Sequence, residues 1–203
     1  MKTAALIAVA GLASAAAAQS VTVNLTHDDA DSNIAIGETV TWTLSISFTG
    51  FADGAAASGG NMRINGDNAL GTSSDMTYTP VNGGNAESTT PESGDSNGAG
   101  IQFVSWTNSI FLESFGGGPA IKTNPFVVGT FDFTGNAEGT LNYSVVRGQA
   151  TSAFVSIDLS AFATSNFTTA DVSYNVQSLT IVPTPASAAL LGLGGLVATR
   201  RRR

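Results

Sequence analysis

The chain has 203 residues, a formal net charge of −7 at pH 7, one histidine and no cysteine. All fifteen acidic residues lie between residues 19 and 182, whereas only three of the eight basic residues do, so this central part carries a formal charge of −12. This balance repels phosphate backbones and excludes nucleic acid as a partner. The absence of cysteine excludes disulfides, thiol catalysis and thiolate metal sites. At 164 residues, the central part is predicted to form one domain.

The first 18 residues have the composition of a secretory signal peptide. Lys2 gives a positive start, and the apolar stretch Ala4–Ala13 follows it. Three alanines, Ala16–Ala18, then provide small residues for cleavage before Gln19. The sequence therefore predicts export of the mature chain, with residues 1–18 removed.

The C-terminal segment, residues 183–203, has the order of a membrane anchor. After Pro183-Thr184-Pro185 comes Ala186–Ala198, which has no charged side chain, and the chain ends in Arg200–Arg203. A low-dielectric environment favours the apolar run, whereas the arginines stay on the wet side of a membrane. Residues 186–199 span about 21 Å as a helix, against a hydrocarbon core of roughly 30 Å. A short anchor of this kind suits a tail that is held transiently and then removed.

This tail resembles the PEP-CTERM sorting tail of Gram-negative bacteria, in which a Pro-Glu-Pro-like motif precedes an apolar helix and an arginine cluster. Thr184 stands here where the family usually has Glu. The resemblance implies export, anchoring in the membrane through the C-terminal helix, and processing by an exosortase-like enzyme in cells that build extracellular polysaccharide. It also implies the sorting residues Pro183, Thr184, Pro185, Arg200, Arg201, Arg202 and Arg203.

Between the tails, residues 19–182 show a dominant periodicity of two. In Thr39–Phe48 apolar and hydroxyl residues alternate without a break, which places one face in a core and the other in solvent. Similar stretches are separated by clusters of Gly, Asn, Asp and Ser, for example 50–60 and 66–75. This pattern predicts an all-β fold, a single antiparallel β-sandwich of about nine strands. The expected strands are Val21–Leu25, Thr39–Phe48, Asn61–Ile64, Met76–Val81, Ile101–Thr107, Phe126–Phe133, Leu141–Arg147, Ala153–Leu159 and Val172–Val182.

Residues 82–100 contain no large apolar side chain. A segment of this composition has nothing to bury, so a flexible surface loop is predicted there. A lid, or a loop ordered by cations, is the alternative.

Two strand-like segments carry a second, local resemblance. Ile36–Trp42 and Val127–Phe133 resemble strands of the cohesin-like and carbohydrate-binding sandwiches found on bacterial surface proteins. The resemblance implies the sandwich architecture and a binding role.

Residues for catalysis are few. The single histidine, His27, has no Gly-x-Ser-x-Gly nucleophile motif as a partner and is predicted to be an exposed side chain beside two aspartates. A glycosidase needs two carboxylates flanking a sugar bond, and Asp132, Glu113 and Asp158 lie among apolar neighbours. Most other acids lie in turn-like segments, where they provide solubility. We therefore expect no enzyme activity and no cofactor.

A calcium site is predicted near the start of the domain. Asp29, Asp31 and Asn33 present oxygen ligands at alternate positions, and Gly37-Glu38 follow. Hard cations prefer such oxygens, although the offsets are not those of an EF-hand. An acidic turn before a strand is the alternative.

Exposed aromatic rings can form a sugar-binding platform, and the candidates are Trp106, Phe111, Phe115 and Tyr78. Trp42 is predicted to lie in the core. In the other interpretation, Trp106 also lies between packed layers.

Together these features predict an exported cell-surface or extracellular-matrix protein with an adhesive or structural role. The expected partners are an exosortase-like enzyme, the membrane, and extracellular polysaccharide or surface proteins. A carbohydrate-binding module for extracellular polysaccharide is the alternative function.

Overall fold

The computed structural model describes residues 19–51, 53–81, 84–85, 93–108, 110, 113, 116, 118–147, 154–158, 163–166 and 172–184. The predicted signal peptide and residues 185–203 of the predicted sorting tail lie outside this set. No helix in the described ranges is long and apolar enough to cross a membrane.

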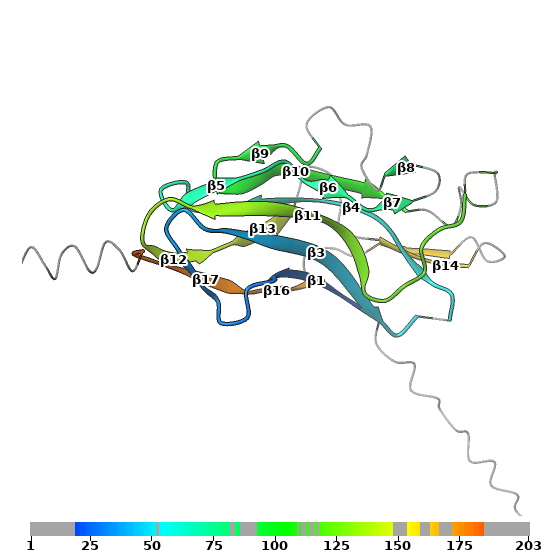
Figure 1. The fold of residues 1–203 in the computed structure, drawn as a ribbon. Coiled ribbons are helices and arrows are strands. Elements are labelled where there is room, and N and C mark those ends of the chain that lie inside the picture. The colour runs from blue at the N-terminus through cyan, green and yellow to red at the C-terminus, as the bar shows by residue number, and fades with distance from the viewer. Residues whose placement is uncertain are drawn as a thin grey trace, which may run out of the picture.

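Two six-stranded sheets pack face to face as a sandwich (Figure 1). The first sheet has the order β16 (Val172–Val176), β1 (Ser20–His27), β3 (Thr39–Thr49), β11 (Phe126–Gly135) and β5 (Gly71–Ser73), and β6 (Thr77–Tyr78) also pairs with β11. The second sheet has the order β15 (Ala163–Asn166), β14 (Phe154–Asp158), β4 (Ala56–Asn65), β10 (Gly100–Thr107) and β9 (Ser96–Asn97), and β13 (Ser144–Arg147) also pairs with β4.

Two smaller sheets complete the fold. One has the order β12 (Gly139–Asn142), β17 (Ser178–Val182) and β2 (Asn33–Ala35). The other pairs β7 (Pro80–Val81) with β8 (Gly84–Asn85).

The all-β class and the sandwich architecture are confirmed, but the predicted number of about nine strands is wrong, and the antiparallel arrangement holds for most strand pairs and not for all. The described part of the chain contains seventeen strands, and the pairs β1–β16 and β17–β2 are parallel. The predicted strand 172–182 divides at Gln177 into β16 and β17, which join different sheets. Strands of two or three residues, such as β5 and β9, are too short to show a periodicity in the sequence.

The segment 50–60 also differs from its prediction as a separator between strands. Ala56–Gly60 begin β4 and are buried throughout. Small side chains let other parts of the chain approach both faces of this strand, and the ring of Trp106 lies where a Cβ atom at Gly60 would be. A run of Ala, Ser and Gly therefore forms a central strand here.

Residues 93–100 differ from the flexible loop predicted over 82–100. Ser93 and Ala99 are buried, β9 and the start of β10 lie within the segment, and the backbone of Gly94 donates to the carbonyl of Phe103. Hydroxyl groups provide part of this packing, because Tyr78 and Ser93 hydrogen-bond at 2.7 Å in the interior. Residues 82–83 and 86–92 of the predicted loop lie outside the described set.

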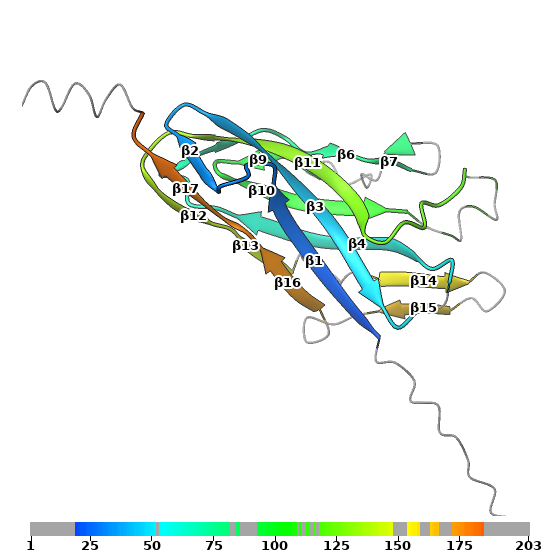
Figure 2. The ribbon, with the colours of Figure 1, turned by 60° about the horizontal axis from the view of Figure 1, so that its bottom comes forward.

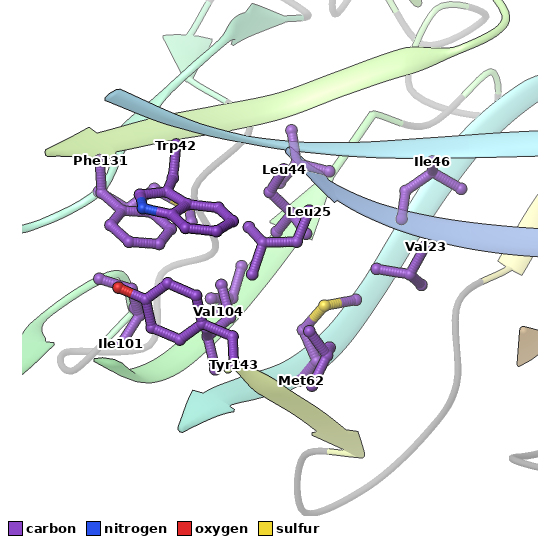
Figure 3. Packing of buried hydrophobic residues seen from close by; sticks show 14 of the residues in the cluster. Val23, Leu25, Trp42, Leu44, Ile46, Met62, Ile101, Val104, Phe131 and Tyr143 are labelled. Atoms are coloured by element: carbon purple, nitrogen blue, oxygen red, sulfur yellow. The ribbon is translucent and has the colours of Figure 1, made fainter. Parts of the chain in front are cut away.

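The core lies between the two large sheets (Figure 3). Every second residue of β3 is buried from Val40 to Phe48, and Trp42 is 0% exposed, which confirms its predicted place in the core. The ring of Tyr143 meets that of Trp42 edge to face at 4.8 Å. Its hydroxyl donates to the Ala99 carbonyl at 2.6 Å, and burial raises the pKa of Tyr143 well above its usual value. This contact ties the second sheet to the aromatic cluster of the first.

Candidate functional site: a hydroxyl face on the first sheet

The outward side of the first sheet is covered by short polar side chains. Figure 2 looks toward this sheet, with β1, β3 and β11 crossing in front of the second sheet. Because alternate residues of a strand point to opposite faces, the apolar residues of these strands enter the core and their hydroxyl and amide residues face outward. We call this surface the hydroxyl face. It consists of Thr22, Asn24, Thr26, Thr39, Thr41, Thr43, Ser45, Ser47, Thr77, Thr130, Asp132, Thr134, Ser173 and Asn175.

A row of four threonines crosses the middle of this face. The strand register pairs Thr26 with Thr43, Thr43 with Thr130, and Thr130 with Thr77. Neighbouring strands are about 4.8 Å apart, so the row runs roughly 14 Å across four strands. Within the described residues, none of these four hydroxyls has a hydrogen-bonding partner on another side chain. We call these four residues the threonine row, and their hydroxyl groups are available to a ligand.

Hydrogen bonds between side chains hold the residues on either side of the threonine row. On one side Thr41 donates to Asp132 Oδ1 at 2.8 Å, and the hydroxyls of Thr39 and Thr134 are 2.7 Å apart. On the other side Asn24 donates to the hydroxyl of Ser47 at 2.9 Å. Its Oδ1 accepts a hydrogen bond from the amide of Asn175 at 3.2 Å. These bonds cross between strands, so they fix side-chain positions over the width of the sheet.

The face is close to electrically neutral although the domain is strongly acidic. Asp132 is the one charged side chain in the set defined above. Among the described residues of these strands, two large apolar side chains are exposed, each by 38%: Val127, which pairs with Ser45, and Tyr174 of β16, which pairs with the inward-facing Val23. The surface can therefore exchange hydrogen bonds over a wide area without the cost of removing many charges from water.

The predicted calcium ligands lie beyond one end of the hydroxyl face, with Asp29 and Asp31 in the turn between β1 and β2 and Asn33 at the start of β2. The carboxylates of Asp29 and Asp31 both accept from the backbone N–H of Asn33, at 2.9 and 3.1 Å. The hydrogen bond from Asn33 is the main reason why the pKa of Asp29 lies below its usual value. The described residues contain no cluster of three or more His, Cys, Asp or Glu suited to a metal ion. The turn uses these oxygens to close itself, and calcium binding stays a prediction.

The predicted aromatic platform does not form from the two of its residues that are described. Trp106 is 2% exposed and Tyr78 is 5% exposed, so neither ring is open to a sugar, and the interpretation in which Trp106 lies between packed layers is confirmed. Trp106 packs over Gly60, whose missing side chain makes room for the indole. Phe111 and Phe115 lie outside the described residues.

The candidate catalytic side chains have structural contacts instead of a shared cleft. His27 is half-buried, not exposed as predicted. Its ring lies 4.8 Å from that of Trp42, and its Nε2 is 3.2 Å from the carbonyl of Ser178. Glu113 forms an ion pair with Lys122 at 3.1 Å, and Asp132 is held by Thr41. Asp158 belongs to β14 of the second sheet.

Of the predicted sorting residues, Pro183 is exposed and Thr184 is half-buried just after β17. Pro185 and the four arginines lie outside the described set.

The threonine row is the feature that reasoning from the sequence missed. Each strand shows its alternation of hydroxyl and apolar residues, but the register between strands depends on pairs that are far apart in the chain, such as Thr43 and Thr130, which are separated by 87 residues. No local signal in the sequence indicates that register.

No protein-family model matches this chain, and a search of curated proteins also finds no match. Among solved structures it is similar to a type II cohesin, A11, from Bacteroides cellulosolvens, at 10% identity and a TM-score of 0.48, over 79% of this chain and 99% of that one. It is also similar to the third ScaB cohesin of R. flavefaciens in complex with a group 1 dockerin, at 16% identity and a TM-score of 0.47, over 82% and 97%.

A third similar structure is the cohesin module of a family 33 glycoside hydrolase from Clostridium perfringens. The identity is 12% and the TM-score is 0.43, over 78% of this chain and 99% of that one.

Proposed function

We propose that this chain is a non-catalytic adhesion module of an exported bacterial surface or matrix protein, and that it binds its partner through the hydroxyl face. The observation that carries the proposal is the threonine row at the centre of that face. Its hydroxyls are aligned across four strands. A partner that meets this row gains several hydrogen bonds from groups that the sheet has already positioned, so little side-chain entropy is lost on binding.

The contacts of the candidate catalytic side chains support a role without catalysis. A general acid or base must be within hydrogen-bonding reach of a substrate. In the described part of the domain, Glu113 is paired with Lys122, and His27 is held between Trp42 and the Ser178 carbonyl.

The sequence of both tails supports the cellular location. With a signal peptide at 1–18 and the PEP-CTERM-like tail at 183–203, the proposed location of the acidic domain is outside the inner membrane, where the tail first anchors it and an exosortase-like enzyme then processes the tail. Cell fractionation tests this part. We expect replacement of Arg200–Arg203 by Ala to change the membrane-bound fraction and the size of the mature product. An intact, unprocessed chain in the cytoplasmic extract would contradict the assignment.

The hydroxyl face is tested by placing a bulky charge in the threonine row. The measurement is the amount of labelled full-length protein that stays bound to cells of the native bacterium from which the gene for this protein has been deleted. We expect Thr43→Arg and Thr130→Arg to remove most of the retention, because each puts an unpaired cation into the contact. The matched control is Thr107→Arg, which changes an exposed threonine on β10 of the other sheet. Equal retention of Thr43→Arg and Thr107→Arg would contradict the proposal.

Treating the cells separates the two kinds of partner. If the partner is a surface protein, protease removes retention and periodate, which oxidises sugar diols, does not. If it is extracellular polysaccharide, the results are reversed. We propose carbohydrate binding as the second function because a pocket next to Phe51, described below, has the residues that such a site requires. The buried Trp106 and Tyr78 do not supply one.

A further inference from the structure

A pocket of about 210 Å³ opens where the chain passes from the first sheet to the second. It lies between the end of β3, residues 50, 51 and 53–55, which come before β4, and Lys122 and Asn124, which precede β11. Ligand sites for drug-sized molecules measure about 300 to 1,000 Å³. This pocket is smaller, so it admits one small ring. It lies apart from the threonine row, on residues to which the proposed adhesion assigns no role.

Backbone contacts give the pocket a fixed shape. The side chain of Asn124 accepts a hydrogen bond from the Phe48 N–H at 3.1 Å and donates to the Phe48 carbonyl at 2.6 Å. It thus continues the ladder of β3 as a neighbouring strand would. Gly50 and Gly54 both have positive φ angles, 80° and 85°, which turn the chain back around the opening. The walls are therefore formed before any ligand arrives.

Two phenylalanines and two charged residues are part of the pocket lining. The rings of Phe48 and Phe51 meet edge to face at 5.8 Å, with Phe48 buried and Phe51 half-buried. Lys122 lies on one side, and its ammonium is kept in place by Glu113 at 3.1 Å. Asp53 lines the pocket as well and is exposed to solvent. An apolar ring, a hydrogen-bond donor and a strong acceptor thus surround one small space.

We propose that this pocket binds a single neutral hexopyranose residue, as a terminal unit or a branch of a polysaccharide. The C–H face of such a sugar is apolar and fits the ring of Phe51, while its hydroxyls can donate to Asp53 and accept from Lys122. A sugar acid fits less well, because its carboxylate faces Asp53 and a domain with a formal charge of −12. This inference deepens the second, carbohydrate-binding function and does not depend on the hydroxyl face.

The test is a titration of the full-length protein with the methyl glycosides of glucose, galactose, mannose and N-acetylglucosamine, followed by saturation-transfer NMR. We expect at least one of the four to bind. Phe51→Ala is expected to weaken that binding by at least about fivefold, because it removes the ring against which the sugar packs. Lys122→Met and Asp53→Asn should weaken it as well. The control for Lys122→Met is Arg63→Met, on the exposed side of β4, which should bind as the original protein does.

Three results would overturn the site. The first is no saturation transfer with any of the four glycosides. The second is binding that Phe51→Ala, Lys122→Met and Asp53→Asn all leave unchanged in proteins whose melting temperatures match the original. The third is tighter binding of methyl glucuronide than of methyl glucoside, which would contradict the preference for a neutral sugar. A negative glycoside titration would not affect the proposal of adhesion through the hydroxyl face. The cell-retention result for Thr43→Arg, in turn, has no bearing on sugar binding in the pocket, so the two proposals can be tested separately.

Discussion

The outer surfaces of the two large sheets differ, and the difference follows from side-chain size. On the first sheet, β3 alternates threonine and serine with large apolar residues, and its outer side is the open hydroxyl face. On the second sheet, β4 begins with Ala56–Gly60, whose residues are buried on both sides. Ala56 packs on the outer side with Ile110 and Ala120, in a small cluster separate from the main core.

A buried amide holds this second layer in place. Asn108 is 0% exposed and donates to the carbonyls of Ala57 and Ile121, and its Oδ1 accepts from the Ile121 N–H. The comparison teaches that small residues on the outer side of a strand let another segment cover it. A row of β-branched hydroxyl residues keeps the strand's propensity for a sheet and leaves the surface open.

The sharpest way to break this comparison is to remove one amide from each surface. Asn108→Ala should lower the free energy of unfolding by about 2 to 4 kcal/mol, because it leaves buried backbone groups without partners. Asn24→Ala on the hydroxyl face should cost about 1 kcal/mol or less, since water replaces its partners there. Urea denaturation measures both values. Similar losses in the two variants would show that the outer sides are not different in this way.

A second change tests the close packing of β4. A Cβ atom at residue 60 would overlap the ring of Trp106, so Gly60→Ala should cost about 2 kcal/mol. Thr43→Ala, in the open row of β3, should stay within about 0.5 to 1 kcal/mol. In a Trp106→Leu background the added methyl group has space, and the cost of Gly60→Ala should largely disappear. Additive losses in a double-mutant cycle would contradict the contact.

The acidic turn at the end of the hydroxyl face allows a third test. If Asp29, Asp31 and Asn33 bind calcium, the ion should stabilise the protein by about 1.4 kcal/mol at a concentration ten times the dissociation constant. A rise in melting temperature would show this, and Asp31→Ala should abolish the rise. Asp67→Ala is the control, because that carboxylate also closes a turn by accepting from a backbone N–H, that of Ala69. A melting curve that neither calcium nor a chelator changes would remove the site.

The smallest effect concerns acid stability at the edge of the second sheet. A hydrogen bond from the backbone N–H of Ser96, 2.9 Å from Asp75 Oδ1, lowers the pKa of Asp75 below its usual value of 3.8. A carboxyl whose pKa is lower in the folded state stabilises the fold above pH 3.8, and that contribution is lost as the pH falls through the folded value. The urea concentration at which half of the protein is unfolded should therefore decrease as the pH drops below about 4. In Asp75→Asn the urea midpoint should depend slightly less on pH in this range. The same pH dependence as in the original protein would contradict this account.

Much of the fold could be predicted because the signal is local. The alternation in Thr39–Phe48 correctly placed Trp42 in the core and the threonines of β3 on the outside. Composition was a poorer guide in Ala56–Gly60, since small residues are typical of turns as well as of strands packed on both sides. It was also a poor guide for 93–100, where hydroxyl and backbone hydrogen bonds replace apolar side chains in the packing.

The candidate site was less predictable than the fold. The prediction of an aromatic platform was wrong because the exposure of Trp106 depends on the residue against which its ring packs. That residue is Gly60, which is 46 residues away in the chain. The pocket beside Phe51 brings residues 50, 51 and 53–55 together with Lys122 and Asn124, which no spacing rule connects. Calcium binding and the sorting function of the tail stay predictions from the sequence.

By itself the sequence determined the all-β class, the side of β3 that faces the core, and the charge of the domain. These properties depend on residue type and on a period of two, which are visible within a few positions. Only the tertiary structure decided that Thr26, Thr43, Thr130 and Thr77 stand in one row and that a pocket forms between the sheets. The reason is that strand register and sheet order come from contacts between distant parts of the chain, which are selected by the packing of the whole core.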